Sequence, residues 1–179
     1  LGLLFFGYMG FLASFSSIAN DQFHQPASMI GWLFALFVGS YLLGANMTRR
    51  LSGVKNDSKL LDLGVILLTI SVVLFALERA GLVAPLPGLA TALLLYLFAL
   101  GMMLGVLGAH VLKDLPQIAG TAAGIMGALQ VFAGVVGSVA SAFLYRGDAS
   151  STVFILGVAS VMTVLVYLLN RRQLKAYPE

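Results

Sequence analysis

The sequence predicts an all-α membrane protein, folded as a bundle of six transmembrane helices. Of its 179 residues 60% are hydrophobic and 9% are charged, whereas soluble domains average about half apolar and about a quarter charged. Six apolar runs, each close to the roughly 20 residues that cross a bilayer core, account for most of the chain. The charged residues lie between these runs, although a soluble bundle would need a polar face along each helix.

The six runs are joined by short connections, so we expect a single transmembrane domain over residues 1–179. Pro85 and Pro87 should interrupt the chain between the third and fourth runs, and Pro116 between the fourth and fifth, which favours antiparallel hairpins. The first run begins at Leu1 without a basic segment before it, which indicates a piece of a longer chain and not a signal peptide. The expected spans are residues 1–19, 29–47, 60–77, 89–112, 119–145 and 152–169.

The Lys and Arg residues predict which side of the membrane each connection faces. Eight of the ten lie after the second, fourth and sixth runs, and only Arg79 and Arg146 lie after the third and fifth. Short connections rich in Lys and Arg stay in the cytoplasm. The chain is therefore expected to be a multi-pass protein of the inner (plasma) membrane with a cytoplasmic C-terminus.

Glycines in the fourth and fifth runs recur at helical spacing and predict close helix packing. The same spacings of four and three residues occur in both runs. Small residues let helices approach closely in a bilayer, so the two faces are expected to meet near the cytoplasmic connection. Simple packing and a sliding contact during a conformational cycle both fit this pattern. The helix-packing residues are Gly101, Gly105 and Gly108 in the fourth run and Gly120, Gly124, Gly127 and Gly134 in the fifth.

Patterns of catalytic, metal or cofactor sites do not occur in the sequence. The lack of Cys removes thiolate ligands and cysteine nucleophiles, and no HExxH or Walker sequence is found. Acidic residues lie in connections or at the ends of runs, with Asp62 closest to entering a span. His110, near the end of the fourth run, fits either a proton relay or a bond to water or backbone. We expect no enzyme, no cofactor, no metal and no nucleic-acid partner.

Two stretches of the sequence resemble a known family of transporters. One stretch follows Pro116 and resembles the eleventh transmembrane segment of major facilitator drug:proton antiporters of the Bcr/CflA type. A looser match resembles the eighth segment and its cytoplasmic exit. The matching residues are 119–123 and 127–130 in the fifth run, and 31–36, 44 and 49–51 in and after the second. The resemblance implies that the chain is segments seven to twelve, one half of a twelve-helix major facilitator fold.

The resemblance also implies a function and a partner. It implies proton-coupled efflux of lipophilic drugs or related small molecules by alternating access, together with a missing N-terminal six-helix half. No run carries a carboxylate near its centre, so the coupling group is expected in that other half. The loop before Arg49 lacks the acidic residue of the stronger family pattern, so Arg49 and Arg50 are explained by topology. A sugar or amino acid derivative exporter and a six-helix membrane scaffold remain alternatives, and six more apolar runs upstream of Leu1 would decide against the scaffold.

Aromatic residues repeat at helical spacing in the first two runs, which border the central cavity within the family resemblance. Such stripes are also typical of lipid contacts or of a bundle core. Gln130, near the middle of the fifth run, needs partners for its amide, which could be the fourth or second run, water or a ligand. Rings and Met side chains suit planar, greasy substrates. The expected substrate-binding residues are Tyr8, Phe11, Phe34, Phe37, Tyr41 and Met103 as apolar walls and Gln130 as the polar group.

Overall fold

The computed structural model describes residues 1–51, 57–113 and 116–176, with side chains described as far as residue 170. These residues form helices and their connections, without a strand, and confirm the predicted all-α six-helix bundle. A single 3₁₀ turn, η1 (Pro116–Ile118), precedes α5. The helices are α1 (Gly2–Asp21), α2 (Ala27–Leu51), α3 (Asp57–Arg79), α4 (Pro85–Lys113), α5 (Ala119–Leu144) and α6 (Ser150–Ala176).

Six helices in the described part of the chain are long and apolar enough to cross a membrane, so the chain is a multi-pass membrane protein. Several helices extend past the apolar runs, because backbone hydrogen bonding continues into the polar residues that flank each run. Pro85 is the first residue of α4 and Pro87 lies in its first turn, so both belong to the helix. The first turn of a helix leaves its N–H groups without intrahelical partners, and proline loses nothing there.

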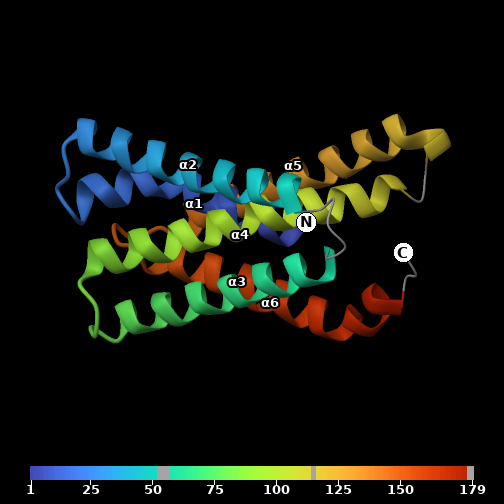
Figure 1. The fold of residues 1–179 in the computed structure, drawn as a ribbon. Coiled ribbons are helices and arrows are strands. Elements are labelled where there is room, and N and C mark those ends of the chain that lie inside the picture. Colours follow the sequence, from blue (N-terminus) through green and yellow to red (C-terminus); the bar gives the residue numbers. More distant parts are fainter. Residues whose placement is uncertain (52–56, 114–115, 177–179) are drawn as a thin grey trace.

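The helices form a middle pair with two further helices on either side (Figure 1). α2 and α5 lie along one edge of the bundle, α3 and α6 lie along the opposite edge, and α1 and α4 lie between them. The C-terminal ends of α2, α4 and α6 share one end of the bundle, which we call the terminal end. The C-terminal ends of α1, α3 and α5 share the other end, which we call the far end.

The helix contacts follow an internal two-fold pattern. The most extensive contacts join α1 to α5, α2 to α4 and α3 to α4, followed by α1 to α6 and α3 to α6. Exchanging α1 with α4, α2 with α5 and α3 with α6 maps this set onto itself. Since α1 and α4 run in opposite directions, the bundle consists of two inverted three-helix repeats, an arrangement that recurs in secondary transporters.

Small residues and hydroxyl groups bring α1 close to α5. A Cβ atom added at Gly137 would overlap the backbone carbonyl of Phe6. Ser138 donates a hydrogen bond of 3.0 Å to the carbonyl oxygen of Met9, and the buried hydroxyls of Ser14 and Ser141 bond to each other. Such contacts combine close van der Waals packing with interhelical hydrogen bonds, which hold helices together where lipid offers no hydrophobic drive.

The symmetry-related contact of α2 with α4 uses the same devices. A Cβ atom at Gly101 would overlap the carbonyl of Tyr41, and one at Gly44 would overlap the carbonyl of Phe98. Ser40 donates a 2.7 Å hydrogen bond to the Leu94 carbonyl, and Thr48 donates one of 3.0 Å to the Met102 carbonyl.

The glycines of α4 and α5 therefore do not meet as the sequence suggested. Gly101 and Gly105 contact α2, and of the expected α4–α5 contacts only Gly108 approaches α5, where its added Cβ would lie 3.7 Å from the Met126 methyl group. The glycine face of α4 is already occupied by α2, and α4 and α5 touch only slightly. Gly134 packs on Met9 of α1. Nothing in the described residues lies within 4 Å of an added Cβ at the remaining three, Gly120, Gly124 and Gly127.

Candidate ligand-binding cavity

Five of the seven expected substrate-binding residues line one cavity between α1 and α2. The cavity has a volume of about 190 Å³, and a single residue of α4 contributes to its lining. The five are Tyr8, Phe11, Phe34, Phe37 and Tyr41. The other lining residues are Leu12, Val38, Leu42 and Leu97. Helical spacing of three and four residues places the aromatic side chains of each helix on one face, and the α1–α2 hairpin turns the two faces toward each other.

Three phenylalanine rings form the aromatic wall of this cavity, and a fourth packs behind them. The rings of Phe11 and Phe37 meet edge to face with centroids 5.4 Å apart, and Phe34 lies 6.3 Å from Phe11 and 6.4 Å from Phe37. Phe15, which is fully buried, lies behind them within 5.3 Å of all three centroids. Edge-to-face pairs are worth about 0.5–1.5 kcal/mol beyond the area they bury. The rings thus hold a preformed aromatic surface.

The backbones of α1 and α2 touch only slightly, which leaves room for this cavity. α2 is held instead by α4, through the close contact at Gly101 and the hydrogen bonds of Ser40 and Thr48. These contacts fix the position of α2 along α4 and its rotation about its own axis, and with them the position of Tyr41. The cavity therefore lies between a helix anchored to α4 and a helix anchored to α5.

Two phenol groups supply the polar atoms of the cavity side chains. Tyr8 lies on α1 and Tyr41 on α2, and both side chains are half-buried. Among the residues that the structure describes, neither hydroxyl makes a hydrogen bond. Every other lining side chain is apolar. The cavity can therefore bind a ligand by shape, ring contact and one or two hydrogen bonds.

Met103 and Gln130 lie outside this cavity. Met103 is buried toward α3, where an added Cβ at Gly64 would lie 2.6 Å from its Cγ. It lies six residues after Leu97, which places it on another face of α4. Gln130 is 9% exposed and shares the α1-facing side of α5 with Gly134 and Ser141. Its Nε2 atom has no hydrogen-bond partner in the described part of the chain, so its N–H groups make no bond to the fourth or second run.

The remaining residues of the cavity, and Phe15 behind it, could be recognised in the sequence only in part. Phe15 follows Phe11 by one helical turn, so its spacing is a usable signal. Leu12, Val38 and Leu42 are ordinary apolar residues of a span, and nothing in their pattern separates a cavity wall from a lipid contact.

The ionisable residues gather at the two ends of the bundle. At the terminal end His110 Nδ1 lies 3.7 Å from Asp57 Oδ2, and Tyr167 donates a 2.7 Å hydrogen bond to Asp62. At the far end Glu78 is 8% exposed, and its Oε2 atom has no partner among the described residues. Its position at the end of a run, next to Arg79, had concealed this burial. None of these groups lines the aromatic cavity.

Comparison with known proteins adds no relative to this description. The chain matches no protein-family model, no curated protein and no solved structure. The candidate site therefore rests on its own residues and their geometry.

Proposed function

We propose that the chain is the C-terminal half of a secondary transporter that exports lipophilic drugs or related small molecules by alternating access, coupled to protons. The observation that carries this proposal is the aromatic cavity between α1 and α2, inside a bundle that spans a membrane. Its apolar walls favour a planar, greasy ligand over a sugar, because each sugar hydroxyl would need a hydrogen-bond partner on leaving water. The resemblance to major facilitator antiporters supports the same function; it rests on residues 119–123, 127–130, 31–36, 44 and 49–51.

The internal symmetry supports transport over a passive scaffold. Secondary transporters are commonly built from inverted repeats, with the substrate site near the bilayer midplane where repeats meet. Here the cavity lies between α1 and α2, next to α4, and each of the two strongest small-residue contacts joins a helix of one repeat to a helix of the other. Because these contacts hold α1 to α5 and α2 to α4, each helix pair moves as a unit, and the two pairs can move against each other around a ligand bound between α1 and α2.

The edge formed by α2 and α5 supports a larger assembly. These two helices have the lowest buried fraction of the six membrane spans in the described chain. Large apolar side chains on them are exposed, among them Trp32 at 72%, Leu43 at 65% and Phe132 at 69%. We propose that an N-terminal six-helix half covers this edge, so that the cavity becomes enclosed between the two halves. The terminal end then lies in the cytoplasm of an inner (plasma) membrane protein, since eight of the ten Lys and Arg residues follow the second, fourth and sixth apolar runs of the sequence.

Binding of a planar lipophilic dye tests the cavity directly. The protein is reconstituted in phosphatidylcholine nanodiscs, and binding of rhodamine 6G is followed by fluorescence anisotropy. Phe34→Ala removes a half-buried ring from the wall and is expected to weaken dye binding about tenfold, because ring contacts with the ligand are lost. Tyr41→Phe keeps the ring and removes the hydroxyl, and is expected to cost a few-fold in affinity.

The matched control is Phe132→Ala, which removes an exposed ring of α5 that does not line the cavity. This variant is expected to bind the dye as the wild type does. Equal affinities of Phe34→Ala and Phe132→Ala, with unchanged melting temperatures, would show that the dye only partitions into the lipid. The cavity would then lose its assignment as a substrate site.

A further inference from the structure

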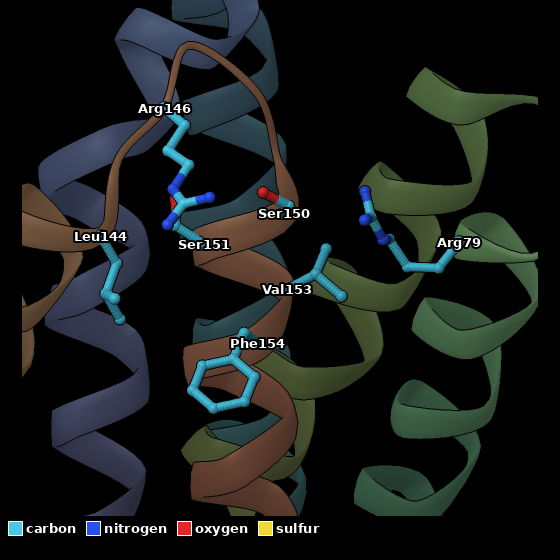
Figure 2. Close-up of a pocket in the computed structure, with 7 residues that line it drawn as sticks. All are labelled: Arg79, Leu144, Arg146, Ser150, Ser151, Val153 and Phe154. Atoms are coloured by element: carbon cyan, nitrogen blue, oxygen red, sulfur yellow. The ribbon is translucent and has the colours of Figure 1, made fainter.

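A second cavity lies at the far end of the bundle and is lined by two arginines. They are the two that lie outside the Lys- and Arg-rich connections expected to face the cytoplasm. Arg79 ends α3, and Arg146 lies in the connection between α5 and α6. Both line one cavity of about 420 Å³ at the start of α6. Figure 2 shows the two side chains reaching toward the first turn of α6 from opposite sides. Of the ten Lys and Arg residues, the two outside the charge bias thus share one site.

A buried hydroxyl without a partner lies in the same cavity. Ser151 is 5% exposed, and its Oγ atom has no hydrogen-bond partner among the described residues. It lines the cavity together with Ser150, whose hydroxyl points toward the Arg146 side in Figure 2. A buried hydroxyl that leaves water without a new partner is destabilising. Ser151 therefore offers a hydrogen bond that a ligand in this cavity can accept.

The guanidinium groups of this site are not consumed by ion pairs. In the part of the chain that the structure describes, neither Arg79 nor Arg146 has a carboxylate oxygen within 4.0 Å. Asp148 lies nearby and accepts hydrogen bonds from the Ser150 N–H, at 3.2 Å, and from the Ser150 hydroxyl. The Ser150 hydroxyl, and to a smaller extent the charges of Arg79 and Arg146, lower the pKa of Asp148. Asp148 does not line the cavity, and Glu78 is buried against α4 at Gly88.

The remaining wall of the cavity is apolar. Leu144 ends α5 with 43% exposure, Phe154 lies one turn into α6 with 62% exposure, and Val153, in the first turn of α6, is buried. These residues belong to the membrane-spanning helices, whereas Arg79 and Arg146 lie at or beyond their ends. The cavity therefore presents cations at the level of the lipid headgroups and apolar side chains toward the hydrocarbon.

We propose that this far-end cavity binds an anionic membrane lipid, with its phosphate held between Arg79 and Arg146 and its acyl chains over Leu144 and Phe154. Guanidinium groups bind phosphate oxygens through paired, charge-assisted hydrogen bonds. The Ser151 hydroxyl donates a further hydrogen bond to the same phosphate. The apolar wall favours a lipid over a free phosphate ion, which would gain nothing from Leu144, Val153 and Phe154.

Lipid titration followed by native mass spectrometry tests this site. The protein in detergent is titrated with phosphatidylglycerol, with phosphatidylcholine as the uncharged comparison. Wild type is expected to bind one phosphatidylglycerol more tightly than any phosphatidylcholine. Removing both charges in Arg79→Gln/Arg146→Gln is expected to weaken the affinity of this first lipid about 25-fold, because each arginine contributes about 5-fold. Ser151→Ala is expected to weaken it a few-fold while both arginines remain.

The matched control is Arg49→Gln/Arg50→Gln, which removes two exposed arginines from the terminal end of α2. This control is expected to keep the tight first site. Equal losses in the two double variants would mean that only net charge matters and would overturn the proposal. Inorganic phosphate is added as a competitor, and displacement of the lipid by an equal concentration of phosphate would assign the cavity to a soluble anion instead. Thermal melts identify a variant that fails to fold. In that case the proposal is decided by whether Ser151→Ala weakens binding of phosphatidylglycerol.

Discussion

The two halves of α5 have the same kind of small-residue face but different surroundings. In the far half, Gly134 and Gly137 pack against α1, and Gly137 leaves no room for a side chain. In the terminal half, Gly120, Gly124 and Gly127 meet nothing within 4 Å in the described structure. Periodic glycines thus show where a helix permits close approach, and the position of the neighbouring helix decides whether the approach occurs. The terminal half, which we call the open half, could pack closely against another helix, but α4 does not pack there.

Alanine at one glycine of each half gives the largest expected contrast. Gly137→Ala places a methyl group into the carbonyl of Phe6 and is expected to lower the free energy of unfolding by about 3 kcal/mol, since backbone must move. In Gly124→Ala the added methyl group lies in open space, and the free energy of unfolding is expected to change by less than about 0.5 kcal/mol. Unfolding by SDS in mixed micelles measures both. A comparable loss at Gly124 would show that the open half is packed in the protein as it exists.

Hydroxyl deletions sharpen the same comparison at a smaller scale. Ser14→Ala/Ser141→Ala removes the buried hydrogen bond between α1 and the packed half, and is expected to cost about 0.6 kcal/mol. Thr121→Ala, an exposed position in the open half, serves as the control and is expected to have no measurable effect. The single variants complete a double-mutant cycle. A coupling energy of zero would mean that the serine pair only fills space.

The smallest expected effect concerns the hydrogen bond that closes the packed half at the far end. Tyr145 donates a 2.9 Å hydrogen bond to Asp21 of α1, and burial together with this bond raises the pKa of Tyr145 from 10.0 to about 12. The folded state holds the phenol proton more tightly, so its stabilising contribution is complete below pH 10 and is lost as the pH rises to 12. Tyr145→Phe should lack this part of the alkaline loss. The difference between the wild-type and variant melting temperatures, measured across that range, checks the expectation, and a constant difference would contradict it.

The sequence predicted what depends on one helix or on two consecutive ones. Helical spacing sets the faces of the aromatic residues, and a short connection makes α1 and α2 neighbours. The sequence could therefore bring together five residues that line one cavity: Tyr8, Phe11, Phe34, Phe37 and Tyr41. The six-helix bundle followed from run length and apolarity in the same way.

The parts that failed depend on contacts between distant helices. Met103 lies outside the cavity because its face of α4 meets α3, which no spacing within α4 reveals. The glycines of α4 were paired with α5, since that helix is adjacent in sequence, but the bundle pairs α4 with α2. Arg79 and Arg146 are far apart in the chain, and their shared exception to the charge rule was the only sign that they belong together.

The weak backbone contact between α1 and α2 gives the bundle an uneven stiffness. Carbonyl-to-glycine contacts lock α1 to α5 and α2 to α4, so each pair resists shear over its contact length. α1 and α2 are in contact mainly through their phenylalanine rings. α1 and α4 are joined by a hydrogen bond of 2.8 Å that the Tyr96 hydroxyl donates to the Leu4 carbonyl oxygen. Rings can rotate about their side-chain bonds on a faster timescale than helices can separate. The cavity therefore lies between two helix pairs that are joined mainly through side chains, so that rotation of a few side chains can change its volume while both helix pairs keep their shape.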